Sequence, residues 1–573
     1  MDFHYSAERN VQLVLYLLKA YNIKRVIASP GATNVAIVSS MQQDPFFEMI
    51  SCVDERSAAY MAVGIADETG EPVVLTCTGA TSSRNYLPAL TEAYYRKLPI
   101  IAITSSQDLS NVGHLIAQVT DRTAYPNDVF VDSAQIQNIM CPKDEWDCNI
   151  KLNKVIQNFR VNPGPVHINL ATLGLCKNDV VELPETKVIR LYLSGDSFPE
   201  ISHNGHVAIF IGSHQDFSSQ EINAIEKFCQ VYNAVVFCDH TSSYHGKYRI
   251  MHALIGAQDK RKFDISQVDT LIHIGEVSGD YDTLRYLKPK RVWRVNPDGF
   301  FRDTFQGKLD KVFAMSELQF FDLYAKNKSI LSTTYFEECN LIYDDILKRI
   351  PTLPLSNICI ARILSSYIPN DSVLYLGILN TLRSWNFFNL DNSIKTVSNV
   401  GGFGIDGILS SLIGASLCNP NRLHFGIVGD LSFFYDMNCL CNRQIGNNVR
   451  ILVINNGHGQ EFEMYNHGAA FMGTDVNEFV AAQGHNGNKS RDLIKHYSSD
   501  LGFKYLVSEK IDNIHECAKE FVSSCSEKPI VWEIFTTNSG ENEALKTMRN
   551  LVPDTISTSQ KIKDIFRSIT GIK

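Results

Sequence analysis

The sequence predicts an α/β protein made of three doubly wound, parallel-sheet domains. Short apolar runs such as residues 72–76 (PVVLT) and 99–104 (PIIAIT) alternate with segments of helical spacing along the whole chain, and this alternation is typical of βαβ units. The runs are apolar at successive positions, which indicates strands covered by helices on both faces. Four runs in the middle of the chain each end near Gly, Asp or Asn, which favours a doubly wound sheet there.

The elements divide the chain into three parts. The first part has helical spacing over residues 11–21, a strand at 24–28 (KRVIA), a turn (SPGATN) that opens another helix, and a late strand at 164–171 (GPVHINLA). Residues 183–204 and 326–355 break the alternation and are expected to be linkers. The predicted domains are therefore 1–183, 204–325 and 356–573.

The middle domain is expected to bind neither FAD nor NAD. Its strands are predicted at 206–213 (HVAIFIGS), 234–239 (AVVFCD), 270–275 (TLIHIG) and 291–296 (RVWRVN). The first of these strands leads into HQDF, without the G-x-G-x-x-G loop that lets a backbone approach a dinucleotide pyrophosphate.

Composition excludes several classes of protein. The chain has 573 residues, of which 44% are hydrophobic and 20% charged, so it is globular rather than disordered. Its net charge is −9, and no basic stripe stands out along the sequence. Both observations argue against a nucleic-acid partner. No run approaches the ~18 apolar residues of a membrane span, and the N-terminus lacks the apolar core of a signal peptide. Fourteen cysteines without a repeating framework are typical of reduced thiols. We expect a cytoplasmic multidomain enzyme.

A glycine-rich loop at residues 402–407 (GFGIDG) satisfies G-x-G-x-x-G between a strand-like and a helix-like segment. With an acid downstream at Asp430, this is the fingerprint of a dinucleotide site. A nicotinamide-dependent oxidoreductase is therefore a minor alternative. The segment around Asp430 argues against it, because residues 429–432 (GDLS) begin a turn into another helix instead of ending a strand beside a ribose.

Two strand ends in the last domain carry oxygen ligands. The strand HFGIVGD ends in Asp430, and the strand RILVIN is followed by residues 455–459 (NNGHG). A carboxylate, an amide oxygen and a backbone carbonyl suit Mg²⁺, which completes its octahedron with phosphate oxygens and water. Glycines let the backbone approach those phosphates. The sequence therefore predicts an anchor for Mg²⁺ and a diphosphate.

These motifs resemble those of a known superfamily. GDLS followed by Asn455-Asn456 resembles the thiamine-diphosphate motif of the 2-oxo acid decarboxylase and acetolactate synthase superfamily, and SPGATN, VDERSAAYMAVGIAD and GPVHINL resemble its pyrimidine-binding domain. GDLSFFYDMN, GIDGILS, GPVHIN and the DER at 54–56 resemble the menaquinone-pathway synthase branch, whose members join 2-oxoglutarate to isochorismate. Leu431 departs from the superfamily motif and agrees with this branch. The resemblance implies pyrimidine-binding, central and diphosphate-binding domains at the boundaries given above.

The resemblance implies a role for each motif residue. Glu55 would bond the aminopyrimidine ring and drive removal of the thiazolium proton, with a pKa raised by its apolar helix start; the alternative is an ordinary ion pair with Arg56. Ile405 would lie under the cofactor, and the backbones of Phe403 and Ile405 would bond the pyrimidine edge. Metal ligands would be Asp430, Asn456 and the carbonyl of His458, although the two side chains suit turn capping as well. Residues near the diphosphate would be Gly429, Leu431, Ser432 and Gly459.

The substrate residues depart from the branch. Arginines of the branch are replaced at Gln107 and Val400 and in the turn that contains Thr33, and Glu461 replaces an isoleucine. Because Val, Thr and Gln do not reproduce the bidentate fork of arginine, a dicarboxylate acceptor such as isochorismate is disfavoured, and Glu461 would repel it further. Arg383 aligns with a branch arginine and could hold a carboxylate. Candidate catalytic residues are Glu55, Gln118, His458 and Glu461, and candidate substrate residues are Arg383, Gln107, Thr33 and Phe462.

The predicted function is carboligation: loss of CO₂ from a 2-oxo acid, then transfer of the remaining acyl or aldehyde unit to an acceptor. One alternative is a simple decarboxylase with His458 or Glu461 as proton donor. Another is a cofactor-binding paralogue without activity. In the superfamily the counterpart of Glu55 and the metal motif come from different subunits, which implies a homodimer or homotetramer. The segment 468–489, rich in Gly and Asn, is expected to be a lid.

Overall fold

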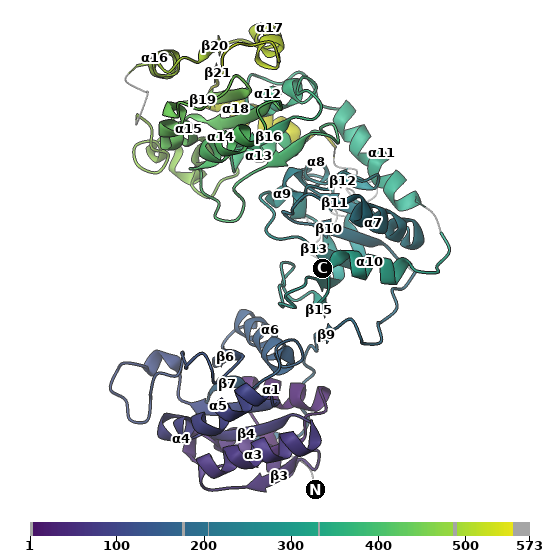
Figure 1. Ribbon diagram of the computed structural model, residues 1–573, viewed down its shortest axis with the longest axis vertical. Coiled ribbons are helices and arrows are strands. Elements are labelled where there is room, and N and C mark those ends of the chain that lie inside the picture. Colours follow the sequence, from purple (N-terminus) through teal and green to yellow (C-terminus); the bar gives the residue numbers. More distant parts are fainter. Residues whose placement is uncertain (1–3, 175–177, 204, 331–332, 485–489, 554–573) are drawn as a thin grey trace, which may run out of the picture. The chain divides into compact units, whose positions relative to one another are not determined.

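The computed structural model describes residues 4–174, 178–203, 205–330, 333–484 and 490–553. Contacts divide the chain into two units, Met1–Glu200 with Arg291–Ser316, and Ile201–Lys290 with Glu317–Lys573. Both units contain parallel sheets flanked by helices (Figure 1), which confirms the predicted α/β class. The three predicted domain boundaries stay a prediction, because the contacts separate two units. The end of the third predicted domain, 554–573, lies outside the described residues.

The main sheet of the first unit has six parallel strands in the order β3-β2-β4-β5-β7-β6. The strand predictions there are confirmed. The strands are β2 (Arg25–Ala28), β3 (Glu48–Ser51), β4 (Val73–Thr78), β5 (Ile100–Ser106), β6 (Asp132–Ile136) and β7 (Val166–Ala171), and the helices are α1 (Arg9–Ala20), α2 (Val35–Gln43), α3 (Glu55–Thr69), α4 (Ala80–Asn85), α5 (Leu87–Arg96) and α6 (Pro142–Asn158).

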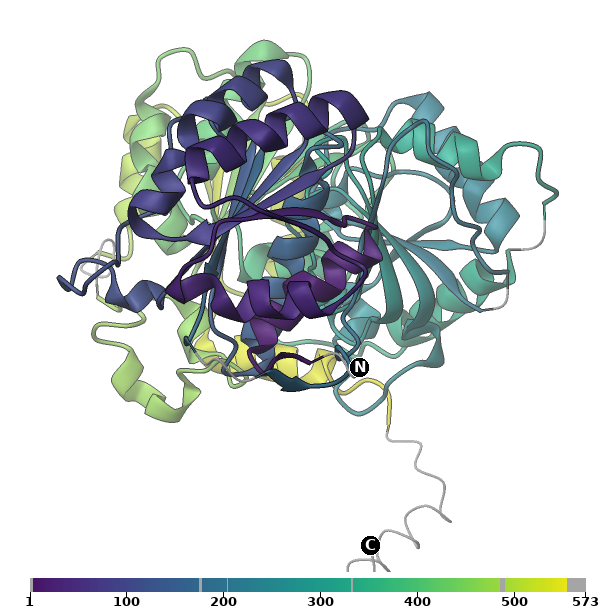
Figure 2. The same cartoon turned by 90° about the horizontal axis from the view of Figure 1, so that it is seen from below.

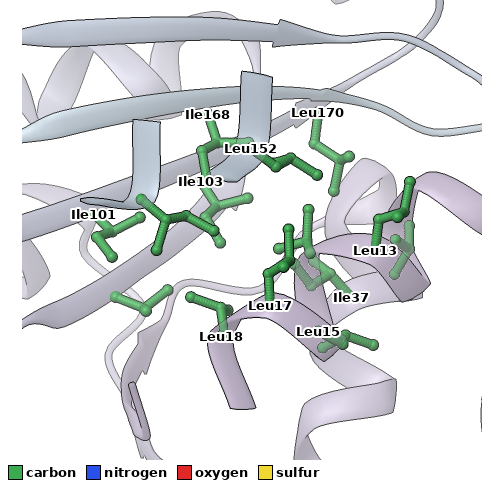
Figure 3. Close-up of a cluster of buried hydrophobic side chains, with 14 of the residues drawn as sticks. Leu13, Leu15, Leu17, Leu18, Ile37, Ile101, Ile103, Leu152, Ile168 and Leu170 are labelled. Carbon is green, nitrogen blue, oxygen red and sulfur yellow. The ribbon is translucent and has the colours of Figure 1, made fainter. Parts of the chain in front are cut away.

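Alternate residues of β5 face two different hydrophobic cores. Ile101 and Ile103 belong to the cluster that contains α1, whereas Ile100 and Ala102 belong to the cluster that contains α3 and α5. Figure 3 shows the first cluster, in which Leu17 and other α1 side chains lie beside these strand residues. Helices lie on both faces of this sheet in Figure 2. Successive strand residues point to opposite faces, which is why the first four residues of β5 are all apolar.

One predicted linker is wrong, because residues 183–204 contain strand β9 (Arg190–Tyr192). β9 is parallel to β15 (Leu309–Phe313), which is parallel to β14 (Lys288–Val295). Leu191 of β9 is buried in one cluster with Ile189 and residues of β15. A three-residue strand depends on a partner far along the chain, so its local pattern is too short to reveal it. A two-stranded antiparallel pair joins β1 (Tyr5–Ser6) to β8 (Asn178–Val180).

The second unit contains the central strands in the order β12-β11-β10-β13, all parallel where paired. The predicted central strands are confirmed, and RVWRVN corresponds to β14. The strands are β10 (Val207–Ile211), β11 (Val235–Cys238), β12 (Arg249–Met251) and β13 (Gln267–Ile274), with helices α7 (Ser219–Tyr232), α8 (Ala253–Gly256), α9 (Tyr281–Leu284) and α10 (Glu317–Ala325).

The second predicted linker is also wrong. Residues 326–355 contain helix α11 (Thr334–Lys348). Its buried residues are Tyr335, Cys339, Tyr343 and Ile346, and this spacing is that of one apolar helix face. Polar residues between them obscure this pattern in the sequence.

The last six strands of the second unit form a parallel sheet in the order β17-β16-β18-β19-β21-β20. The strands are β16 (Val373–Leu376), β17 (Lys395–Val397), β18 (His424–Gly429), β19 (Val449–Asn455), β20 (Lys504–Ser508) and β21 (Ile530–Phe535). The helices are α12 (Asn357–Leu364), α13 (Asn380–Trp385), α14 (Ile408–Cys418), α15 (Asp430–Asp436), α16 (Leu493–Asp500), α17 (Ile511–Phe521) and α18 (Asn538–Met548). Within the described ranges, no helix combines the length and apolar character that crossing a membrane requires.

Candidate active site

Neighbouring strands β16, β18 and β19 bring most of the motif residues of the last domain to one cavity. The carboxyl ends of parallel strands meet at the same sheet edge, so the loops after these three strands lie side by side. The cavity has a volume of about 140 Å³. Among the residues that line it are the predicted Ile405, Gly429, Asp430, Leu431, Ser432, Asn456, His458, Gly459, Glu461 and Phe462. We refer to it as the motif cavity.

Asp430 connects the ends of β18 and β19. It is the first residue of α15, only 4% exposed, and its Oδ2 accepts the backbone N–H of Gly457 at 3.1 Å. Burial raises the pKa of the Asp430 carboxyl to about 7. No Lys or Arg is among the described residues that line the motif cavity. The Asp430 carboxyl therefore faces a cavity in which no described lining residue is basic.

The two adjacent asparagines after β19 have different roles. Asn455 donates from Nδ2 to Oε1 of Glu533 on β21 at 2.7 Å, so it joins two strands. Asn456 lines the motif cavity, and its Oδ1 accepts the backbone N–H of His458 at 3.4 Å. Gly457 has φ +82°, a left-handed conformation that favours glycine. Only the second asparagine is therefore in position to contact a ligand.

The motif cavity fits the predicted metal and diphosphate in the chemistry of its donors. A carboxylate (Asp430), an amide oxygen (Asn456) and a backbone carbonyl (His458) are hard oxygen ligands of the kind Mg²⁺ takes. The His458 carbonyl accepts the N–H of Gln460 at 2.9 Å and has a second lone pair. A Cβ built on Gly429 would meet no protein atom within 4 Å, so the space above this glycine is free for a ligand. Within the described ranges, no cluster of three His, Cys, Asp or Glu residues could hold a metal.

The glycine-rich loop is joined to the GDLS segment. The Ser432 hydroxyl donates to the Ile405 carbonyl, and Asp436 accepts both the N–H of Ser410 at 2.7 Å and its hydroxyl at 2.5 Å. Phe403 has φ +55°, a conformation uncommon for a residue with a side chain. Phe403 is not among the residues that line the motif cavity.

A second cavity of about 590 Å³ shares Leu379, Asn380, Glu461 and Phe462 with the motif cavity. We refer to it as the outer cavity. In it, a guanidinium nitrogen of Arg383 donates to Oε1 of Glu461 at 2.6 Å. With its amide oriented to satisfy both groups, Asn380 donates to Oε2 of Glu461 at 2.8 Å and accepts the Glu461 N–H at 3.2 Å. The structure thus brings Arg383 and Glu461 together as an ion pair.

The other arginines of the outer cavity are paired as well. Arg549 lies 2.8 Å from Asp282, and Arg285 lies 2.7 Å from Asp259. Burial raises the pKa of the Asp280 and Asp282 carboxyls, and it raises the pKa of Glu541 to about 7. Each arginine that lines this cavity therefore has a carboxylate of the chain within hydrogen-bonding distance.

The remaining predicted residues lie in the first unit. Glu55 is the first residue of α3, half-buried, and its Oε2 accepts from Nδ2 of Asn85 at 3.4 Å. Thr33 donates its hydroxyl to the Ser105 carbonyl at 2.7 Å, and Gln107 directly follows β5, so both lie at the end of that strand. Gln118 is exposed in a loop with φ +66°. The roles of these residues stay predictions.

Asn380 is a cavity residue that the sequence patterns did not single out, and the lid at 468–489 stays a prediction. Asn380 begins α13 just after β16, the neighbour of β18, and that position beside a motif strand was the available signal. Leu379 before it has φ +71°, a strained conformation of the kind found at ligand sites. In the predicted lid, residues Ala470–Val476 form a 3₁₀ helix, whereas 485–489 lie outside the described residues.

Comparison with known proteins shows what the whole chain resembles. Residues 9–125 match the family described as thiamine pyrophosphate enzyme, N-terminal TPP binding domain. The chain is 28% identical over 560 residues to a 2-succinyl-5-enolpyruvyl-6-hydroxy-3-cyclohexene-1-carboxylate synthase of Bacteroides fragilis, covering 95% of this chain and 98% of that protein. Proteins of the same name from Bacteroides thetaiotaomicron (27% identical, 95% of this chain and 98% of that protein) and Flavobacterium johnsoniae (29% identical, 79% and 84%) are also similar. Over nearly its whole length the chain therefore resembles thiamine-diphosphate-dependent enzymes, and among them the menaquinone-pathway synthase branch.

Proposed function

We propose that the protein is a thiamine-diphosphate- and Mg²⁺-dependent carboligase that decarboxylates a 2-oxo acid and transfers the remaining unit to an acceptor. The observation that carries this proposal is the meeting of Asp430, Asn456 and His458 in one cavity with Ile405 of the glycine-rich loop. An oxygen donor set at the ends of two parallel strands is suited to a metal–diphosphate anchor.

Residues of the motif cavity would hold the cofactor. Asp430, Asn456 and the His458 carbonyl would bind Mg²⁺, and Ile405 would support the ring system, with the backbone of Phe403 at the pyrimidine edge. Thiamine diphosphate supplies the electron sink that allows a 2-oxo acid to lose CO₂. The open space above Gly429 supports contact with the diphosphate, and the neighbouring candidates for that contact are Leu431, Ser432 and Gly459.

Glu55 is proposed to hold and deliver the proton at the pyrimidine ring. Its half-buried position at the start of α3 leaves the carboxyl with only a long bond of 3.4 Å from Asn85. A carboxyl in such a position can share a proton with a ring nitrogen. Since the superfamily assembles this acid and the metal residues from different subunits, we propose that the protein is a homodimer or homotetramer. We also propose that it is located in the cytoplasm.

The outer cavity supports carboligation over simple decarboxylation. This cavity has a volume of about 590 Å³ and adjoins the motif cavity, with which it shares four lining residues. A second substrate would therefore have room beside the reacting atoms. Glu461 and Phe462 line both cavities, and Arg383 lines the outer one. We propose that these residues contact substrate, together with Gln107, Thr33 and Gln118 of the first unit.

A simple decarboxylase is the second candidate. Among the residues that the structure describes, neither buried ring nitrogen of His458 has a hydrogen-bond partner, and Nε2 lies 3.5 Å from Oε1 of Glu463. A histidine whose ring is not held by strong bonds could deliver a proton to the intermediate and release an aldehyde.

Release of CO₂ separates these candidates. Purified protein with thiamine diphosphate and Mg²⁺ is incubated with a panel of 2-oxo acids, with and without aldehyde, ketone and enone acceptors. CO₂ that appears only with an acceptor supports carboligation. CO₂ with aldehyde and without any acceptor supports the decarboxylase. Tight binding of thiamine diphosphate without CO₂ from any acid would refute both, and it would leave a cofactor-binding paralogue without this activity.

A further inference from the structure

We infer that Glu461 is a built-in counter-ion that occupies the guanidinium group of Arg383, so that the outer cavity takes substrates with an uncharged distal group and rejects 2-oxo diacids. The inference deepens the proposed function and rests on it for the identity of the ligand as a 2-oxo acid. It concerns a residue pair that joins the loop after β19 to helix α13.

The pair is fully formed within the chain. Glu461 Oε1 lies 2.6 Å from Arg383, and the two side chains are only 18% and 21% exposed. Oε2 of Glu461 is held by Asn380 at 2.8 Å. A partly buried, charge-assisted pair of this length is among the stronger hydrogen-bonded contacts. A ligand carboxylate at this guanidinium would either have to displace Glu461 or approach Arg383 as a second anion beside it.

The other charges of the outer cavity oppose a ligand carboxylate too. The second and third arginines, Arg285 and Arg549, lie against Asp259 and Asp282. Two further acids that line the cavity, Asp280 and Glu541, are buried. A second anion beside Asp259 and Asp282 would meet like charge in a region of low dielectric, where repulsion is strong. Burial raises the pKa of Asp280 and Glu541 to about 7, so these two acids add repulsion only to the extent that they are ionised.

The uncharged residues of the cavity fit a short alkyl or hydroxyalkyl chain. Leu379, Phe462 and Met464 offer apolar surface, and Ser384 and Asn466 offer neutral hydrogen-bonding groups. Shape and hydrogen bonding can therefore be satisfied without a charge on the distal end of the substrate.

The test compares two acids of equal chain length, 2-oxopentanoate and 2-oxoglutarate, which differ only in the distal methyl or carboxylate. We expect the wild-type holoenzyme to prefer 2-oxopentanoate in kcat/KM. The variant Glu461→Gln keeps the shape of the side chain and removes its charge, so Arg383 becomes free to bind a carboxylate. The preference should then shift toward 2-oxoglutarate by about tenfold to hundredfold, the range expected for a hydrogen bond to a charged group.

Two further variants sharpen the result. The double variant Glu461→Gln with Arg383→Gln should lose the shift, because the guanidinium is gone. The matched control Glu543→Gln removes an exposed charge from α18 and should leave the preference unchanged. If Glu461→Gln does not fold, as judged by circular dichroism and melting temperature, Glu461→Ala takes its place with the same expectation.

A binding readout keeps this inference distinguishable from the proposed function. Calorimetric titration with glutarate and with pentanoate, which cannot be decarboxylated, should show glutarate binding more tightly to Glu461→Gln than to wild type. That gain would support the inference even where no 2-oxo acid is turned over and the proposed function fails. Equal glutarate affinity in wild type and variant, or a wild type that already prefers 2-oxoglutarate, would overturn it.

Discussion

Asp436 holds the start of helix α14 through Ser410, whose N–H it accepts at 2.7 Å and whose hydroxyl it accepts at 2.5 Å. The N–H groups in the first turn of a helix have no partner within the helix, and here the partner comes from the end of α15. Both residues belong to motifs, GIDGILS and GDLSFFYDMN, that are separate in the sequence. The contact therefore fixes the glycine-rich loop relative to the GDLS segment.

Removal of this contact should destabilise the protein. In Asp436→Ala the N–H and hydroxyl of Ser410 lose the buried carboxylate that accepts from both, and we expect a loss of about 1–3 kcal/mol in the free energy of unfolding. Urea denaturation measures it. Ser411→Ala, which alters the neighbouring exposed hydroxyl, is the control and should change stability little. Equal stability of the two variants would mean that the contact contributes nothing.

Glu55→Gln should abolish turnover and leave cofactor binding largely intact. The amide keeps the shape of the side chain but cannot exchange a proton with the pyrimidine ring. Tryptophan fluorescence quenching by thiamine diphosphate measures binding, and CO₂ release measures turnover. Persistent turnover in this variant would show that another group activates the cofactor.

Mixing two inactive variants tests the proposed sharing of the active site between subunits. Glu55→Gln and Asp430→Asn are each expected to be inactive. After unfolding and refolding together in equal amounts, about a quarter of the active sites would combine an intact Glu55 with an intact Asp430 in a homodimer that shares its sites. The recovered CO₂ release is compared with wild type refolded alone. No recovery would indicate that each site is built from one chain.

Glu541 should make stability fall as pH rises. This buried acid accepts the Asn357 N–H at 3.0 Å, and burial raises its pKa to about 7. Because the folded pKa lies above the unfolded value, the folded state binds the proton more tightly. The free energy of unfolding therefore decreases from about pH 4.5 to about pH 7, by a few kcal/mol at most. Glu541→Gln stays neutral and still accepts the N–H.

The measurement is denaturant unfolding at pH 5 and at pH 8, in wild type and Glu541→Gln. The variant should gain stability relative to wild type at pH 8 and differ little at pH 5. Many other groups titrate in this range, so the difference between the two proteins, rather than either profile alone, isolates Glu541. A difference that does not depend on pH would contradict the assignment.

Local patterns were enough to predict most strands and the motif cavity. Residues 100–103 of β5 and 451–454 of β19 are apolar without interruption, since both faces of these strands are buried. Asp430 and Asn456 were predictable because oxygen ligands at the ends of parallel strands meet at one edge. Elements that depend on distant partners were not. Strand β9 exists because β15 pairs with it, and helix α11 hides its buried face among polar residues.

The same limit applies to charge pairing in the outer cavity. The sequence indicated an acid at Glu461 and a base at Arg383, each interpreted as a group that would face substrate. Their contact across the loop and the helix follows only from the arrangement of β16 and β19 on either side of β18. In the sequence, the acid at Glu461 suggests that a carboxylate-binding site has been lost. In the structure, the arginine of that site is present and Glu461 neutralises its charge.

Arg549 sets a limit on how far the chain can be shortened from its C-terminal end. Its guanidinium joins Asp259 and Asp282, and its carbonyl accepts the N–H of Asp259 at 2.9 Å. A chain that ends at residue 553 retains this contact, whereas one that ends at residue 548 removes it from Asp259 and from Asp282, which lines the outer cavity. Expression work and fusion of a tag or reporter should therefore keep every residue through Arg549.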